Sequence, residues 1–235
     1  MRPFDYVAPK TVDQAVALLD ENGAAARPLA GGTDLLADLK EAPAVPQLVV
    51  DISRIEELRG IGETAEGLHI GALTTHSEIM ESDLIAEHAP AMKVAARTIG
   101  AVQTRNMGTL GGNLVTAVPS IDSAPVLLVL DAQITIAGKD GERRLPIGEF
   151  FTGPRQTALG PGELLVNIII PPHALGKSAA FRKFGLRKGQ ALALVNAAAA
   201  ADIKKGIIDQ PRIALGAVAP TPIRAAQAEA ALAGR

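Results

Sequence analysis

The chain of 235 residues contains no cysteine. This excludes disulfide bonds, thiolate-bound zinc and cysteine-bound iron–sulfur clusters from the chain itself. Aromatic residues make up only 3% of the sequence, and the 23 basic residues do not outnumber the 25 acidic ones. The chain therefore lacks the stacking platforms and the basic surface with which proteins bind nucleic acids.

Long apolar runs are also missing. No stretch reaches the roughly 18 consecutive apolar residues of a membrane span, and Met1–Tyr6 lacks the apolar run of a signal peptide. We therefore expect a cytoplasmic protein with no membrane span. The apolar share of 48% is nevertheless high enough for a buried core. The histidines lack metal-ligand spacing, so we predict no metal site and expect surface or internally bonded side chains at His69, His76, His88 and His173.

The first fifty residues predict an α/β unit. Thr11 and Gln14 have the spacing of a capping box, and the apolar positions that follow lie on one face of a helix that ends at Asn22–Gly23. A strand is expected over 27–30, before a glycine pair. A helix is expected over 34–40, ended by Pro43 and Pro46, and a buried strand over 48–52.

Strands and helices also alternate in the rest of the chain. We predict strands over 68–72 and 164–170, an apolar run of the same kind over 133–137, and helices over 77–80 and 92–99. Pro171 and Pro172 mark a boundary. Beyond it, the segments 191–203 and 212–218 are expected to pair through a turn at 204–206, and a helix begins at Gln227.

Two glycine pairs are the most informative feature. Gly31–Gly32 precedes Thr33 and Asp34, and Gly111–Gly112 lies 80 residues further along, before Asn113. Glycine permits left-handed backbone angles and close approach, and successive N–H groups in such turns form anion sites. Two such cradles facing one another predict a site for the diphosphate of a dinucleotide.

Other motifs are weaker. Residues 60–65 match a loose Rossmann fingerprint but lack the preceding apolar strand, and residues 176–178 resemble the end of a P-loop without its first glycine, so we reject both. Asp122 has two interpretations that the sequence leaves open: it caps the helix that follows, or it accepts hydrogen bonds from cofactor hydroxyls.

The glycine pairs belong to a longer series of motifs, which comprises Leu29–Asp34, Ile99–Asn106, Thr109–Asn113, Gly153–Arg155, Pro161–Leu165, residues 181–188 and Ala217–Arg224. In this order the series resembles the FAD-binding subunit of the molybdenum hydroxylases, the family of xanthine dehydrogenase, aerobic carbon monoxide dehydrogenase and nicotinate dehydrogenase. The resemblance covers nearly the whole chain. It implies an α+β fold: a bilobed FAD-binding fold of the p-cresol methylhydroxylase type, with lobes at 1–55 and 56–171, and a small α+β domain at 172–235.

The resemblance also implies the cofactor, FAD, and its contacts. Thr116 and Asp122 would bind polar groups of the cofactor, Ile99 and Leu165 would pack against its rings, and Lys183 would lie near the flavin. The residues around the diphosphate would be Leu29, Ala30, Gly31, Gly32, Thr33, Asp34, Leu35, Leu36, Thr109, Leu110, Gly111, Gly112 and Asn113.

The function implied is electron transfer, with no catalytic acid or base in this chain. A molybdopterin-containing large subunit would oxidise the substrate, and an iron–sulfur subunit would pass the electrons to this FAD. The external acceptor would be NAD, a quinone, ferredoxin or oxygen. Two alternatives are a free-standing FAD oxidoreductase and a non-catalytic nucleotide-binding module. Because family members continue further, we expect the C-terminal domain to be incomplete or to be closed by a neighbouring subunit.

Overall fold

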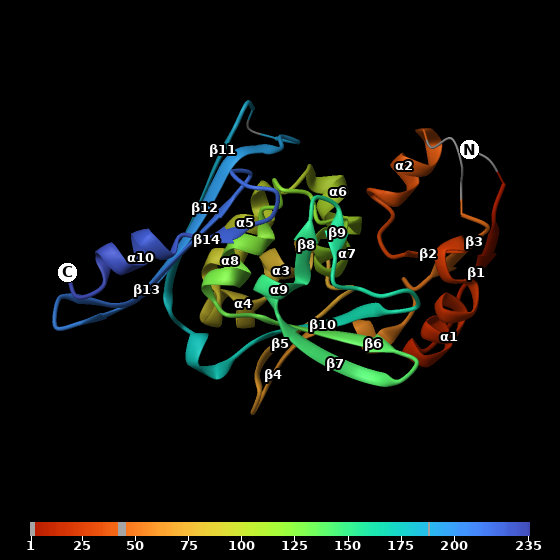
Figure 1. The fold of residues 1–235 in the computed structure, drawn as a ribbon, viewed down its shortest axis with the longest axis horizontal. Coiled ribbons are helices and arrows are strands. Elements are labelled where there is room, and N and C mark those ends of the chain that lie inside the picture. Colours follow the sequence, from red (N-terminus) through yellow and green to blue (C-terminus); the bar gives the residue numbers. More distant parts are fainter. Residues whose placement is uncertain (1–2, 42–45, 188) are drawn as a thin grey trace.

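The computed structural model describes residues 3–41, 46–187 and 189–235. Within these residues, the strands form a three-stranded, a five-stranded and a four-stranded sheet and one two-stranded pair. The sheets follow one another along the chain, from the N-terminal sheet at the right of Figure 1 to the C-terminal sheet at the left. No helix in the described ranges is long and apolar enough to cross a membrane.

The N-terminal sheet is parallel, with the order β1-β3-β2. Helix α1 is capped at Thr11, whose hydroxyl accepts a hydrogen bond from the Gln14 amide, and it ends at Gly23 with a φ of +50°. Its apolar face packs into a small core with β2 and β3. The elements are β1 (Asp5–Val7), α1 (Val12–Asn22), η1 (Gly23–Ala25), β2 (Ala26–Leu29), α2 (Leu35–Glu41) and β3 (Leu48–Asp51).

The second sheet is antiparallel throughout, with the order β4-β5-β10-β6-β7. Central strand β10 is buried on both faces. Ile168 and Ile170 belong to the main core, whereas Leu164 and Val166 pack into the core of α1. A strand covered on both sides reads as a continuous apolar run. The strands are β4 (Ile61–Thr64), β5 (Gly67–Gly71), β6 (Gln133–Gly138), β7 (Gly141–Pro146) and β10 (Leu164–Ile170), and η2 (Glu56–Leu58) precedes them.

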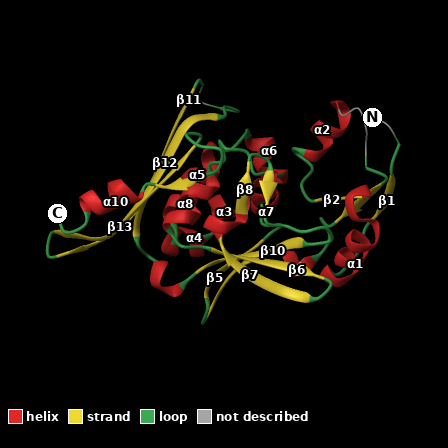
Figure 2. Ribbon diagram, viewed as in Figure 1, coloured by secondary structure: helices red, strands yellow, loops and turns green. Residues whose placement is uncertain are grey.

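Short helices lie above this sheet, between β5 and β6 in the chain (Figure 2). They are α3 (His76–Glu81), α4 (Asp83–His88), α5 (Pro90–Thr98), α6 (Val102–Met107), α7 (Leu110–Thr116) and α8 (Ser123–Val129). All seven residues of α8 are buried, so this helix is the centre of the main core. The segment α9 (Ile147–Phe150), β8 (Phe151–Gly153) and β9 (Gln156–Thr157) follows β7.

The C-terminal sheet, with the order β11-β12-β13-β14, packs against α5 and α8. The turn between β12 and β13 has positive φ at Lys205 and Gly206, as a type I′ hairpin requires. The elements are η3 (Pro172–Ala174), β11 (Ser178–Gly185), β12 (Ala193–Lys204), β13 (Ile207–Gly216), β14 (Ile223–Arg224) and α10 (Ala226–Leu232).

The sequence-based predictions of elements agree with most of this structure. The strand over 164–170 is confirmed to the residue, and the hairpin at 204–206 forms, although β13 begins at Ile207, five positions before the predicted 212. The capping box is only half formed, because Gln14 accepts a hydrogen bond from the Lys10 amide and not from Thr11. Pro43 lies outside the described residues. The division at residues 55 and 171 stays a prediction.

Candidate cofactor site

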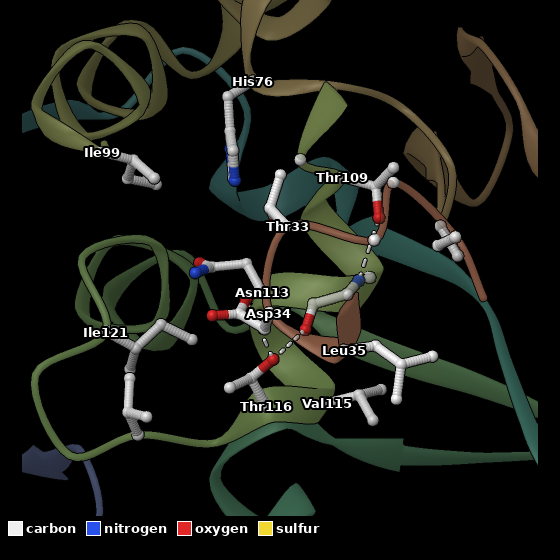
Figure 3. Close-up of a pocket in the computed structure, with 18 of the residues that line it drawn as sticks. Thr33, Asp34, Leu35, His76, Ile99, Thr109, Asn113, Val115, Thr116 and Ile121 are labelled. Carbon is white, nitrogen blue, oxygen red and sulfur yellow. Dashed lines mark hydrogen bonds between the residues drawn. The ribbon is translucent and has the colours of Figure 1, made fainter. Parts of the chain in front are cut away.

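A cavity of about 510 Å³ lies where the first glycine loop, the segment from Ile99 to Asp122, and β10 and β11 meet. Its volume is within the range of small-molecule sites. The exposed lining is more apolar than polar. Figure 3 shows side chains from several elements pointing into it, among them Thr33, Ile99 and Thr116.

The first glycine loop, residues 30–34, forms one wall of the cavity. The backbone amides of residues 31–35 donate no hydrogen bond to any acceptor within residues 3–41, 46–187 and 189–235. Gly32 has a φ of +71°, which turns the chain from β2 into α2. Consecutive amides in such a turn form an anion-binding concavity, and their unmet hydrogen bonds indicate a ligand rich in oxygen.

Gly31 has a different role from the one that its sequence suggests. A Cβ built on Gly31 would lie 1.7 Å from the backbone oxygen of Met107, at the end of α6. This glycine therefore allows the loop to pack directly on the backbone at the end of α6.

The second glycine pair is not an open loop but lies in the first turn of α7. Its amides are already bonded: Leu110 donates to Thr74, Gly111 donates to Ala72, and Gly112 donates to the Thr109 hydroxyl. The prediction of a second backbone cradle for an anion is therefore wrong, because these amides already have acceptors within the chain. Gly111 is needed because a Cβ there would lie 2.7 Å from Ala72, and both glycines leave the cavity wall without side chains.

The two glycine segments are joined across the cavity. The Thr116 hydroxyl lies 3.4 Å from the carboxylate of Asp34 and donates at 2.8 Å to the Gly112 carbonyl, and Figure 3 shows the contact with Asp34 as a dashed line. At the mouth, Arg155 pairs with Asp38 of α2 at 3.3 Å. These contacts link the first glycine loop and α2 to α7 and to Arg155 after β8.

Asp122 forms a buried ion pair with Lys183. The Lys183 ammonium donates at 2.5 Å to the carboxylate and at 3.0 Å to the Thr98 carbonyl, while the Asn196 amide donates at 2.8 Å to the other carboxylate oxygen. Burial raises the pKa of the Asp122 carboxyl, and Lys183 and Asn196 oppose that rise. Asp122 makes no capping hydrogen bond to α8, so the cap interpretation is wrong.

His76 differs from the other histidines. Its side chain lines the cavity with only 2% of its surface exposed, and its Nδ1 has no partner in the described part of the chain. Burial, with a smaller contribution from Arg105, lowers the pKa of His76 to about 4. The other three, His69, His88 and His173, each contact a polar or acidic side chain, as expected. The expectation of a surface or internally bonded histidine is therefore wrong for His76.

The structure brings most of the predicted site residues together. The following line the cavity: Ala30, Gly31, Gly32, Thr33, Asp34, Leu35, Ile99, Thr109, Gly111, Gly112, Asn113, Thr116, Asp122, Leu165 and Lys183. Leu29, Leu36 and Leu110 are not part of the lining; Leu29 and Leu36 surround Gly32, and Leu110 is buried in the core. That these residues bind FAD remains a proposal.

Sequence reasoning missed several lining residues. His76, Thr104, Ser120 and Ile121 belong to the cavity wall, as does the backbone at Gly100 and Gly108. No local motif surrounds His76 in the sequence. Ser120 and Ile121 lie directly before Asp122, so their position next to a predicted site residue was the available signal.

Comparison with known proteins identifies the family. Residues 2–173 match the model of the FAD binding domain in molybdopterin dehydrogenase, and residues 164–235 match the model of the carbon monoxide dehydrogenase flavoprotein C-terminal domain. The chain belongs to this family. The predicted fold, an FAD-binding domain followed by a small C-terminal α+β domain, is confirmed. The predicted cofactor, FAD, is confirmed too. So is the predicted role of the chain as the FAD-carrying electron-transfer component of a molybdenum-dependent oxidoreductase.

Individual relatives cover most of the chain. The carbon monoxide dehydrogenase medium chain of Hydrogenophaga pseudoflava is 36% identical over 223 residues, which are 94% of this chain and 77% of the relative. The nicotinate dehydrogenase FAD-subunit of Eubacterium barkeri is 31% identical over 239 residues, which cover 100% of this chain and 81% of the relative. The solved structure of carbon monoxide dehydrogenase from Hydrogenophaga pseudoflava matches with a TM-score of 0.95 at 38% identity, covering 100% of this chain and 82% of the other.

Proposed function

We propose that this subunit holds FAD in the cavity between the first glycine loop and α7, and relays electrons from a partner iron–sulfur subunit to an external acceptor. The observation that carries the location is the row of amides at 31–35, which lack protein acceptors among the described residues and line the cavity. Such a row suits the diphosphate of a dinucleotide.

The remaining wall suits the rest of the cofactor. Ile99 and Leu165 offer an apolar surface for flat rings, and only 2% of the surface of Leu165 is exposed. Lys183 is fixed beside Ile99 by its bonds to Asp122 and to the carbonyl of Thr98. FAD, when bound, supplies the redox chemistry of exchanging one or two electrons. The chain supplies binding, orientation and exclusion of water.

A binding experiment tests the location. Apo-protein, stripped of flavin, is titrated with FAD in the presence of ADP or of adenosine. If the amides of 31–35 hold the diphosphate, ADP competes with FAD and adenosine competes far less. Equal competition by both compounds would contradict the proposed position of the diphosphate, while a protein that takes up no FAD would contradict the cavity as its site.

We further propose that the partners are an iron–sulfur subunit and a molybdopterin-containing large subunit, located in the cytoplasm. Membership of the molybdopterin dehydrogenase family supports these partners. Purification from the native source, with iron, molybdenum and mass measured, tests them. A monodisperse single subunit without iron or molybdenum contradicts the partners and leaves FAD binding intact. The free-standing oxidoreductase and the non-catalytic module find no support in the comparisons.

A further inference from the structure

Asn196 is a buried polar side chain that joins the C-terminal sheet to the wall of the cavity. It lies in β12, and only 1% of its surface is exposed. Its amide nitrogen donates at 3.0 Å to the Ile121 carbonyl and at 2.8 Å to the Asp122 carboxylate. Both acceptors belong to residues that line the cavity, whereas Asn196 itself does not line it. Any effect of Asn196 on a bound cofactor therefore passes through these two residues.

The orientation of the Asn196 amide is fixed from both sides. Its nitrogen must face Ile121 and Asp122, because a carbonyl and an ionised carboxylate can only accept hydrogen bonds. Its oxygen lies against the backbone of Gly216 in β13, where a Cβ would be 2.2 Å from that oxygen. The same oxygen has no hydrogen-bond partner in the described part of the chain. An unpaired buried oxygen is costly, so what this side chain contributes is its two donors.

The Asp122 carboxylate depends on such donors. Its other oxygen accepts at 2.5 Å from Lys183 and lies 3.3 Å from the Thr98 hydroxyl. Within the described residues, Lys183 is the charged group that contacts Asp122. Burial raises the pKa of the Asp122 carboxyl, while hydrogen bonds from Lys183 and Asn196 oppose the rise. Asn196 therefore favours the ionised carboxylate and holds it in one orientation, and the pair keeps a small exposed area in the cavity wall.

We propose that Asn196 is a positioning residue for the cofactor, which fixes the carboxylate of Asp122, and with it the ammonium of Lys183, in the geometry that binds FAD. This inference rests on the proposed location of FAD in the cavity. It gives the C-terminal sheet a part in cofactor binding through a side chain outside the cavity lining, 74 residues after Asp122 in the sequence.

Two substitutions measure this contribution. Asn196→Ala removes both donors, whereas Asn196→Asp keeps the shape but places a second carboxylate beside Asp122. Apo-protein of the full chain is titrated with FAD by flavin fluorescence. We expect Asn196→Ala to bind FAD roughly five- to tenfold more weakly, the loss expected for one hydrogen bond. At neutral pH Asn196→Asp should bind more weakly still, because two like charges repel each other.

A matched control is Asn167→Ala. The Asn167 amide also bonds to a side chain, that of His69, but neither residue lines the cavity. This substitution should leave FAD affinity unchanged, so a loss equal to that of Asn196→Ala would show that removing any buried amide has the same effect.

The pH dependence of FAD affinity separates positioning from a purely structural role. Loss of the donor in Asn196→Ala raises the pKa of the Asp122 carboxyl further. FAD affinity of this variant should therefore begin to fall at a higher pH than in the parent protein, as the carboxyl takes up its proton. In Asn196→Asp the two carboxyls can share one proton, so FAD affinity should instead rise as the pH is lowered from neutrality.

A double-mutant cycle tests whether Asn196 acts through the ion pair. The background combines Asp122→Ala with Lys183→Met and so lacks both charges. Asn196→Ala should weaken FAD binding in the parent protein but cause no further loss in this background. An equal loss in both overturns the inference, and so does unchanged FAD affinity or an unchanged pH profile in the single variant.

The inference can be decided even where a variant fails. If the background binds too little FAD to measure, the pH profile of Asn196→Ala decides. If Asn196→Ala does not fold, Asn196→Asp decides, because an affinity that does not rise at lower pH overturns the inference. Failure of the parent protein to bind FAD would instead contradict the proposed function.

Discussion

Gly31 packs directly on the backbone of Met107, with room for no side chain: a Cβ on Gly31 would lie 1.7 Å from the Met107 oxygen. The contact joins the loop after β2 to the end of α6. A backbone atom cannot move aside as the end of a flexible side chain does. The position of the first glycine loop beside the cavity therefore depends on Gly31 having no side chain.

We expect Gly31→Ala to destabilise the protein by about 1–3 kcal/mol, the usual cost of overpacking, and to lower FAD affinity because the loop must shift. Denaturant unfolding and FAD titration measure the two effects. Gly62→Ala is the matched control, since a Cβ at Gly62 meets no atom within 4 Å. Equal effects of the two substitutions would contradict the role of the Met107 contact.

Gly32 tests the amide row itself. Gly32→Asp places a negative charge where we propose that the diphosphate binds, so FAD binding should be lost. Gly176→Asp is the control for backbone strain, because Gly176 has a φ of +68° against +71° for Gly32 and lies away from the cavity. Gly32→Asp should lose more stability than Gly176→Asp, because a Cβ at Gly32 would also lie 2.9 Å from the side chain of Leu36, whereas a Cβ at Gly176 meets no atom within 4 Å. Retention of FAD by a folded Gly32→Asp variant would count against the anion site.

The features that sequence predicts well are local. Strand β10 is predicted to the residue because both its faces are buried, which leaves an uninterrupted apolar run over 164–170. The turn after β2 is also predicted, because glycine at the position with φ of +71° is a local requirement. The family motifs predict the cofactor and most of the residues that line the cavity, because each motif is a short continuous segment of the sequence.

The features that sequence misses depend on distant contacts. Glycine disfavours helices, so the sequence predicts a loop at the second glycine pair. The structure instead has both glycines in α7, where residue 111 must be a glycine because a Cβ there would lie 2.7 Å from Ala72. The partners of Asp122 lie 61 and 74 residues further along the chain, so its local pattern leaves a helix cap and a contact to cofactor hydroxyls both open and does not reveal the ion pair. His76 likewise bonds through its backbone amide to the carbonyl of Gly108, 32 residues further along, which no pattern around residue 76 reveals.

The ion pair between Asp122 and Lys183 gives a prediction of stability. Both side chains are less than 10% exposed, so Asp122→Ala leaves a buried ammonium without its partner. We expect a loss of about 3–5 kcal/mol, against about 1 kcal/mol for a lost helix cap. Denaturant unfolding of the apo-protein measures it.

A double substitution checks the cause of that loss. Asp122→Ala combined with Lys183→Met removes both charges, and it should recover part of the stability lost in Asp122→Ala. A double variant that loses the sum of the two single effects would show that the pair is not coupled.

The pH dependence of stability follows from His76. Its pKa is lowered from 6.5 to about 4 because burial disfavours the charged ring. Between these two values the unfolded chain binds the proton and the folded chain does not, so stability falls as the pH drops from about 7 towards 4. The full loss is roughly 3 kcal/mol for a difference of this size.

Carboxylates also titrate in this range, so the measured quantity is the difference between the parent protein and His76→Leu. Unfolding curves of both apo-proteins at several pH values should diverge below pH 6.5 and run parallel above it. Parallel curves throughout would mean that the ring of His76 takes up its proton as readily in the folded protein as in the unfolded chain.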